Sequence, residues 1–224
     1  MSVEPKPAGT VVVLREVAER LELLLLERTF REPGARFGAS VFPGGRVEAE
    51  DVAQTDGDPQ RSAHVAAIRE AREEAGLDLA GVDLAPISRW ITPAFRPRRF
   101  DAWFFLAAVP ASVEVRVDGS EICRHRWLTP RAALEAKGAG EIELAPPTFV
   151  TVTWLSQQAD VRAAFRSLEG APVLTFRPRL CKTPEGRCML YPGDAGYEDE
   201  VFDRPGARHR LWLHAEGWSY ERTI

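Results

Sequence analysis

Three glutamates share one face of a helix predicted over residues 62–75, and this pattern restricts how the chain can fold. Glu70, Glu73 and Glu74 stand at positions i, i+3 and i+4, which are neighbours on a helix of 3.6 residues per turn. The apolar side chains of the segment fall on a different face: Ile68, Ala71 and Ala75. The apolar face can pack on a sheet while the three carboxylates converge on the other side.

The ends of this helix and the segment before it carry turn signals. Ser62 is suited to cap the first turn, and Gly76 is suited to the left-handed conformation that ends many helices. Upstream, Phe42-Pro43-Gly44-Gly45 predicts a sharp break, since glycine adopts backbone angles closed to other residues. Residues 46–61 are polar and include Asp56-Gly57-Asp58-Pro59, so we expect an exposed loop there.

The converging carboxylates suggest a cation. Like charges at these spacings destabilise an isolated helix by about 0.2–0.5 kcal/mol per pair, and a divalent ion would remove that cost. Carboxylate oxygens suit hard ions, and Mg²⁺ binds one or two carboxylates together with substrate phosphates. The alternative interpretation is a solvated helix face in which Arg69 pairs with Glu73.

A longer pattern favours the metal site. Residues 69–77 read Arg-Glu-Ala-Arg-Glu-Glu-Ala-Gly-Leu. They match, position for position, the second half of the Nudix signature, G-x5-E-x7-R-E-U-x-E-E-x-G-U, in which U is apolar. Phe42-Pro43-Gly44-Gly45 supplies the glycine loop that opens this signature. The chain therefore resembles the Nudix hydrolase superfamily.

The chain departs from the signature inside this box. Gly45 lies 24 residues before Arg69, where the signature has 14, so about ten residues are inserted. The position eight before Arg69 holds Arg61, so the first glutamate of the signature is displaced or lost. The acidic candidates for its place are Glu48, Glu50 and Asp51. Such an insertion is tolerable because the entropy of loop closure grows slowly with length.

The resemblance implies roles for individual residues. Glu70, Glu73 and Glu74 look like ligands of Mg²⁺ or Mn²⁺, and Arg69 looks like the residue that orients their carboxylates. Glu121, ahead of a strand that contains Trp127, is similar to a glutamate that serves as a further metal ligand or as the general base, with a surface acid as the alternative. The base that activates water stays open among Glu70, Glu73 and Glu121.

Further sequence similarities limit the range of candidate substrates. The insertion in the box and the stretches 90–93 and 98–105 resemble the branch related to coenzyme A diphosphatases, and residues 24–45 partly match the coenzyme A motif. The resemblance implies substrate-binding residues in these stretches: Arg28, Gly44, Gly45, Arg98 and Arg99. Coenzyme A carries a 3′-phosphate, which the cluster of Arg96, Arg98 and Arg99 is suited to bind. The alternative is that these arginines are solvated or pair with Asp101.

The expected activity is metal-dependent hydrolysis of a diphosphate linkage in a nucleotide derivative, with coenzyme A or acyl-coenzyme A as the first candidate. ADP-ribose, a dinucleotide or a nucleoside triphosphate is the alternative substrate. A non-catalytic Nudix-fold module that senses a nucleotide is the alternative of another class. The intact set of glutamates argues against that sensor, because pure binding has no need of a metal cluster.

Hydrophobic patterning predicts a mixed α and β chain. Two apolar runs, 11–14 and 21–26, predict a hairpin, and residues 31–36 predict a loop. Further strands are predicted at 90–92, 102–109 and 121–128, and helices at 130–137 and 151–168. After Gly170 the chain turns to short apolar segments cut by Pro and Gly, which predicts a β-rich tail.

Together with the resemblance, this pattern indicates an α+β fold. The resemblance implies a Nudix-like α/β/α sandwich with a mixed β-sheet and a β-containing C-terminal extension. We expect the Nudix domain to span residues 8–168. We expect residues 169–224 to form an extension that packs on this domain or on a partner subunit.

Composition limits the partners. The formal net charge of −4 and pI of about 5.7 provide no field that would hold a nucleic acid polymer, so we expect a small-molecule substrate. No apolar run is long enough to cross a membrane, and residues 1–9 lack a signal-peptide pattern, so we expect a cytoplasmic protein. A homodimer is the candidate assembly. The three cysteines do not form a zinc pattern and are expected to be reduced.

Overall fold

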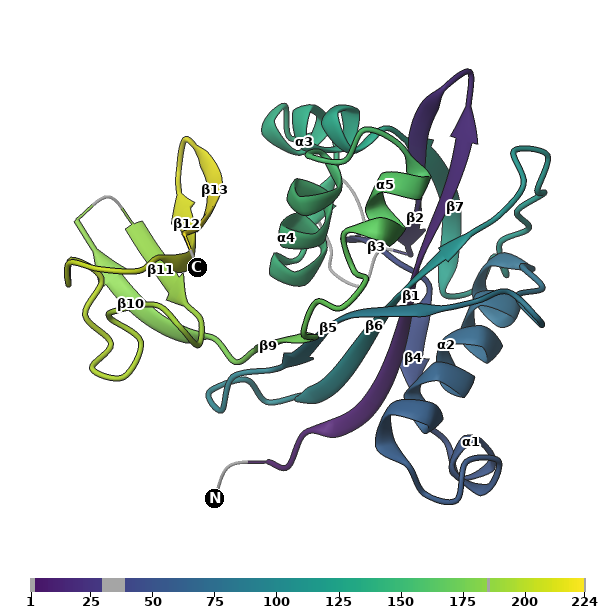
Figure 1. The fold of residues 1–224 in the computed structure, drawn as a ribbon, viewed down its shortest axis with the longest axis horizontal. Coiled ribbons are helices and arrows are strands. Elements are labelled where there is room, and N and C mark those ends of the chain that lie inside the picture. Colours follow the sequence, from purple (N-terminus) through teal and green to yellow (C-terminus); the bar gives the residue numbers. More distant parts are fainter. Residues whose placement is uncertain (1–2, 30–38, 185, 224) are drawn as a thin grey trace.

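A computed structural model of the 224-residue chain describes residues 3–29, 39–184 and 186–223 (Figure 1). The loop expected at residues 31–36 lies outside this range. The described part contains a large mixed sheet, helices on both of its faces, and a second, smaller sheet.

The large sheet has nine strands in the described part, in the order β8-β3-β2-β1-β6-β5-β9, with β4 paired to β1 and β7 to β2. The strands are β1 Lys6–Val17, β2 Arg20–Arg28, β3 Ala39–Val41, β4 Gly44–Arg46, β5 Ala85–Ile91, β6 Phe100–Ala108, β7 Ile122–Leu128, β8 Glu143–Leu144 and β9 Leu174–Phe176. Strand β1 is central, because it runs parallel to β6 and antiparallel to β2 and β4.

The predicted hairpin is confirmed, since Leu14 of β1 lies opposite Leu23 of β2. Its turn is made by Ala18 and Glu19, both with positive φ, in the pattern of a two-residue hairpin loop. The other predicted strands overlap strands of the structure: residues 90–92 with β5, 102–109 with β6 and 121–128 with β7.

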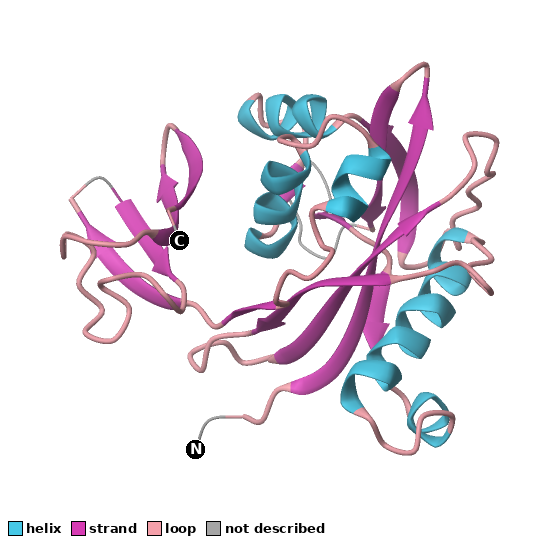
Figure 2. Cartoon of the chain, viewed as in Figure 1, coloured by secondary structure: helices cyan, strands magenta, loops and turns pink. Residues whose placement is uncertain are grey.

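Helices cover both faces of the sheet (Figures 1 and 2). They are α1 Ala49–Ala53, α2 Pro59–Ala75, α3 Pro130–Gly138, α4 Pro146–Leu155 and α5 Val161–Arg166. Side chains alternate along β1, so Val11 and Val13 pack under α2, while Val12 and Leu14 belong to the core shared with α3, α4 and α5. The α+β fold and the sandwich of helices around a mixed sheet are confirmed.

Two details of the helix prediction around the glutamates are wrong. The helix begins at Pro59, and its N-cap is Asp58, whose side chain accepts a hydrogen bond from Arg61 N at 2.7 Å. The helix starts before Ser62 because proline is favoured at the first helical position, where its missing N–H has no partner within the helix in any case. Ser62 is buried and donates to Asp58 O instead. The exposed loop expected at 46–61 contains α1 and the first residues of α2.

The single helical stretch expected at 151–168 is also wrong, because two helices occupy this region. The first, α4, begins at Pro146, again with proline in the first turn. The chain then leaves the helix, and Asp160 caps α5 by accepting a hydrogen bond from Ala163 N at 2.6 Å. This second cap sets the break that apolar spacing alone did not indicate.

The β-rich tail is confirmed. Strand β9 joins the large sheet beside β5, and four further strands form an antiparallel sheet: β10 Arg179–Thr183, β11 Gly186–Leu190, β12 His209–His214 and β13 Gly217–Arg222. Aromatic contacts join the two sheets, because Phe176 stacks on Trp90 at 3.9 Å and meets Tyr191 edge-on at 5.0 Å. The domain bounds 8–168 and 169–224 stay a prediction.

No helix in the described ranges is long and apolar enough to cross a membrane.

Close approach of α2 to β1 depends on residues without bulky side chains. The face of α2 that touches the sheet carries fully buried alanines: Ala63, Ala67 and Ala71. Opposite them, a Cβ atom added to Gly9 would lie 1.8 Å from the carbonyl oxygen of Ala63. The helix therefore lies against the backbone of β1, at a distance that only glycine permits.

Gly9→Ala is therefore expected to destabilise the protein by about 3 kcal/mol, at the upper end of the usual cost of overpacking. The free energy of unfolding in urea measures this effect. Gly138→Ala is the matched control, because no atom lies within 4 Å of the added Cβ at the end of α3. Equal effects of the two substitutions would contradict the close approach.

Candidate active site

Helix α2 places its glutamates against the glycines of β4. Gly44 N donates a hydrogen bond to Glu74 Oε2 at 2.9 Å. A Cβ atom on Gly45 would lie 2.1 Å from Glu70 Oε1, so this position also has no room for a side chain. The structure thus brings the glycine loop and the glutamate helix together, as the sequence pattern predicted.

Arg69 is the hub of the carboxylate cluster. Its Nη1 donates to Glu70 Oε1 at 2.9 Å and to Glu73 Oε2 at 3.1 Å. Its Nε and Nη2 form a bidentate pair with Asp51, at 3.2 and 3.0 Å, and Nη2 also donates to Arg46 O at 2.8 Å. Burial lowers the pKa of Arg69, but the hydrogen bonds that it donates to Asp51 and Glu70 outweigh this effect and raise the pKa above its ordinary value.

Asp51 fills the place left open by the displaced glutamate. It is 1% exposed, and it accepts a hydrogen bond from Glu48 N at 2.8 Å at the start of α1. Asp51 lies six residues after Gly45, which is the interval that the signature sets between its glycine and its first acidic residue. Counting forward from the glycine would therefore have identified it, and the insertion lies between Asp51 and Arg69.

Glu74 is the most buried carboxylate of the α2 cluster, at 6% exposure. Burial raises its pKa to about 7, against the lowering effects of the Gly44 N–H and of Arg28, whose Nη2 lies 3.8 Å from Glu74 Oε1. The charges of Glu70 and Glu121 raise this pKa further. Burial also raises the pKa of Glu70.

Glu121 precedes β7, next to the end of β2. Strand pairing sets Arg28 opposite Ile122, and Thr29 N donates to Glu121 O at 2.8 Å. Arg28 lies 3.8 Å from Glu74, so this pairing places Glu121 beside the cluster, and the charge of Glu121 raises the pKa of Glu74. The residues gathered here are Arg28, Gly44, Gly45, Arg69, Glu70, Glu73, Glu74 and Glu121.

Arg98 and Arg99 are not brought to this cluster. Gly44 pairs with Thr10, whereas Phe100 pairs with Lys6 on the other side of β1. Four residues along a strand and two strand spacings across separate these positions by about 16 Å. Arg99 donates to the carbonyl oxygens of Thr92 and Val3, at 3.0 and 2.6 Å.

The alternative that Asp101 pairs with the basic loop is not what the structure has. Asp101 is bound by Arg89 through two hydrogen bonds, of 2.7 and 2.5 Å. Arg96 and Arg98 are exposed. A substrate-binding role for Arg98 and Arg99 stays a prediction.

The cluster has the donor chemistry of a divalent cation site. Within the described ranges, no three acidic, histidine or cysteine side chains are already placed to hold a metal ion, and the carboxylates turn toward Arg69, Arg28 and the backbone instead. Yet the donors are all carboxylate oxygens, which hard ions prefer. The raised pKa of Glu74 reflects a buried negative charge that a cation would stabilise.

Comparison with known proteins decides the family. A family model, the NUDIX domain, matches residues 5–146. The chain belongs to the NUDIX family. It is 30% identical over 122 residues to the acyl-coenzyme A diphosphatase NUDT19 of Xenopus laevis, which covers 50% of this chain and 32% of that protein. It is 29% identical over 197 residues to the putative nudix hydrolase 7 of Caenorhabditis elegans, covering 71% of this chain and 64% of the relative.

Solved structures share the fold. A NUDIX hydrolase from Alicyclobacillus acidocaldarius matches with a TM-score of 0.67 and 24% identity, covering 76% of this chain and 99% of that one. A binary complex of a C. elegans Ap4A hydrolase matches with a TM-score of 0.51 and 18% identity, covering 74% and 99%. The chain spans about a third of the NUDT19 protein that it matches and less than two thirds of the nematode relative.

Glu74 should make stability depend on pH when metal is chelated. Its pKa is about 7 in the folded chain and near 4.5 when unfolded, so the folded state holds the extra proton between these values. Stability from this group is fully present below pH 4.5 and is lost as the pH rises through 7. We expect the free energy of unfolding of Glu74→Gln to exceed that of the wild type by about 3 kcal/mol at pH 8 in EDTA, and by little at pH 4.5.

Urea unfolding at a series of pH values measures this difference. Glu73→Gln is the matched control, because the Glu73 side chain is 57% exposed on the same helix. Parallel pH profiles for the wild type and Glu74→Gln would contradict the assignment of the buried charge.

Proposed function

We propose that this chain hydrolyses a diphosphate linkage in a nucleotide derivative with the help of Mg²⁺ or Mn²⁺. The observation that carries the proposal is the contact of Glu74 with Gly44 N, because it seats the carboxylates of α2 on the backbone of the glycine loop. Membership of the NUDIX family supports the same activity.

The acidic side chains of α2 have complementary tasks in this proposal. Glu70, Glu73 and Glu74 would hold the cation, which when bound neutralises phosphate charge and makes a water molecule more acidic. Arg69 fixes the carboxylates of Glu70 and Glu73 through its Nη1, and the N–H of Gly44 fixes Glu74. The carboxylates are thus held in position by hydrogen bonds from within the chain.

Substrate contact falls to the groups around this acidic face. Arg28, whose Nη2 lies 3.8 Å from Glu74 Oε1, supplies a cationic partner for the phosphate oxygens. A substrate contact by Gly44 or Gly45 stays a prediction. Removal of the proton from the attacking water is assigned to Glu70, Glu73 or Glu121, all of which belong to the cluster.

Coenzyme A or acyl-coenzyme A is the substrate that we propose. The support is the similarity to acyl-coenzyme A diphosphatases named NUDT19 from Xenopus laevis and Gallus gallus, at 30% and 29% identity over half of this chain. The possible homodimer is a separate prediction, tested by the mass of the particle in solution.

Incubation of the pure protein with Mn²⁺ or Mg²⁺ and a substrate panel tests the reaction. The panel holds coenzyme A, acyl-coenzyme A, ADP-ribose, NADH and deoxynucleoside triphosphates, with products identified by mass. We expect coenzyme A or its acyl form to be cleaved fastest, into two phosphorylated fragments. Faster cleavage of another member reassigns the substrate, and no turnover of any member favours the nucleotide sensor.

Substitution of single glutamates tests the site. Glu73→Gln and Glu74→Gln are each expected to lower kcat by roughly a hundredfold or more while leaving the fold intact. Glu50→Gln is the control, because Glu50 is an exposed glutamate of α1, outside the cluster. Near-normal rates in both α2 variants would sink the assignment of the cation site.

A further inference from the structure

A basic pocket lies between the large sheet and the C-terminal sheet. It encloses about 460 Å³ and is lined by the connection from β5 to β6, by the segment from β9 to β10, and by residues after β11. Figure 1 shows the β5–β6 connection beside the segment that leads from β9 into β10. We propose that this pocket binds a small phosphate monoester, separately from the diphosphate that is cleaved on α2.

The charge of the lining supports an anionic ligand. Among the described residues, its charged members are three arginines and one glutamate: Arg99, Arg177, Arg179 and Glu198. The pocket therefore has a formal charge of +2 in a chain whose net charge is −4. The guanidinium groups come from separate segments, and arginine offers the planar fork that binds phosphate oxygens in pairs.

Two of these arginines are already fixed. Arg179 Nη1 donates to the carbonyl oxygens of Tyr197 and Glu198, at 3.0 and 2.7 Å, and its guanidinium lies over the ring of Tyr197 at 4.4 Å. Arg99 is held by the carbonyl oxygens of Thr92 and Val3. Fixed donors lose little freedom when an anion binds, which favours affinity.

The third arginine, Arg177, is exposed and has no hydrogen bond or ion pair from its side chain to any described residue. Its backbone is nevertheless fixed, because Tyr197 Oη donates to Arg177 O at 2.9 Å. The carboxylate among the described lining residues, that of Glu198, accepts a hydrogen bond from Arg179 Nη2 at 3.2 Å and is 78% exposed. An ion pair so exposed contributes little, so a doubly charged phosphate can displace it.

Strand order separates this pocket from the glutamates of α2. Strands β4 and β9 lie at opposite ends of the series β4-β1-β6-β5-β9, which is four strand spacings or about 19 Å. In coenzyme A the 3′-phosphate and the diphosphate are carried by the same ribose. A single ribose does not span such a distance, so one molecule cannot place its diphosphate at Glu74 and its 3′-phosphate at Arg177.

Binding of AMP and of inorganic phosphate in EDTA, measured by calorimetry, tests the proposal. Without a cation the carboxylates of α2 repel phosphates, so binding in EDTA reports on the pocket whether or not the chain is a hydrolase. We expect one AMP per chain with a Kd of about 1 mM or tighter. Equal affinity for phosphate would assign recognition to the phosphoryl group alone, in support of the proposal, and no saturable binding of either would overturn it.

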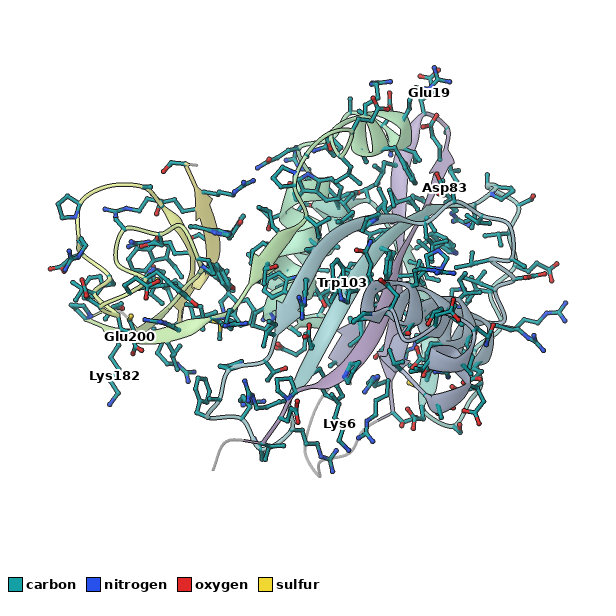
Figure 3. The ribbon with its side chains drawn as sticks, turned by 60° about the horizontal axis from the view of Figure 1, so that its bottom comes forward. Lys6, Glu19, Asp83, Trp103, Lys182 and Glu200 are labelled. Carbon is teal, nitrogen blue, oxygen red and sulfur yellow. The ribbon has the colours of Figure 1, made fainter. Side chains whose placement is uncertain are left out.

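Substitutions locate the binding. Arg177→Ala is expected to weaken AMP binding at least tenfold, and Glu198→Gln to tighten it several-fold by removing the competing carboxylate. Arg187→Ala is the matched control, because Arg187 is exposed and pairs with Lys182, on the face of the C-terminal sheet opposite to that of Arg179. Lys182 points away from the protein in Figure 3. Equal losses in Arg177→Ala and Arg187→Ala would overturn the assignment.

Turnover distinguishes a separate site from part of the catalytic cleft. We expect Arg177→Ala to leave kcat and KM of the cleaved substrate unchanged. A raised KM would show that Arg177 binds the substrate itself, and it would overturn the separation of the two sites.

Discussion

Contact between α2 and bare backbone is the constraint on which the rest of the molecule depends. Gly9, Gly44 and Gly45 lie under this helix or beside its carboxylates, and none has room for a Cβ atom. On the helix side, the small side chains of alanine allow the close approach, and every buried alanine of α2 is 0% exposed to solvent. A helix seated on backbone cannot shift by a fraction of its diameter without a clash, so its glutamates are held at the edge of β4. The acidic cluster thus owes its position to residues that carry no charge.

Carboxylates held so close together repel one another, and the positive charge of Arg69 offsets this repulsion. Its guanidinium reaches Asp51, Glu70 and Glu73 at once, with a further hydrogen bond to the backbone of β4. Removal of Arg69 would leave the carboxylate of Asp51, whose side chain is 2% exposed, without its counterpart. The segment just before the insertion therefore has a structural function: α1 turns Asp51 inward, to 1% exposure, against Arg69.

Hydrophobic periodicity and short motifs were sufficient to predict the central strands and the shared face of the glutamates. They were not sufficient to predict where the surrounding helices begin and end. The hairpin, the left-handed Gly76 and the face shared by Glu70 and Glu74 follow from periodicity and turn chemistry, which act over a few residues. The start of α2 was misplaced because Ser62 and Asp58 are both good caps, and only the proline after Asp58 decides between them. A polar composition likewise predicted a loop for a segment whose Asp51 is buried by a distant arginine.

The separation of two residues in the sequence does not show how far apart they lie across a sheet. Arg98 and Arg99 stand close to strand β6, yet register places them on the other side of β1 from Gly44 and four residues along it. Arg177 is far from Arg99 in the sequence but shares a pocket with it, because β9 adds to the edge of β5 and the stacked rings of Trp90 and Phe176 lock that edge. Tyr191 follows β11 of the C-terminal sheet, is fully buried and contacts both rings edge-on, so it packs the C-terminal sheet against β5 and β9. The extension can therefore shape a second anion site while leaving the glutamates of α2, on the other side of β1, untouched.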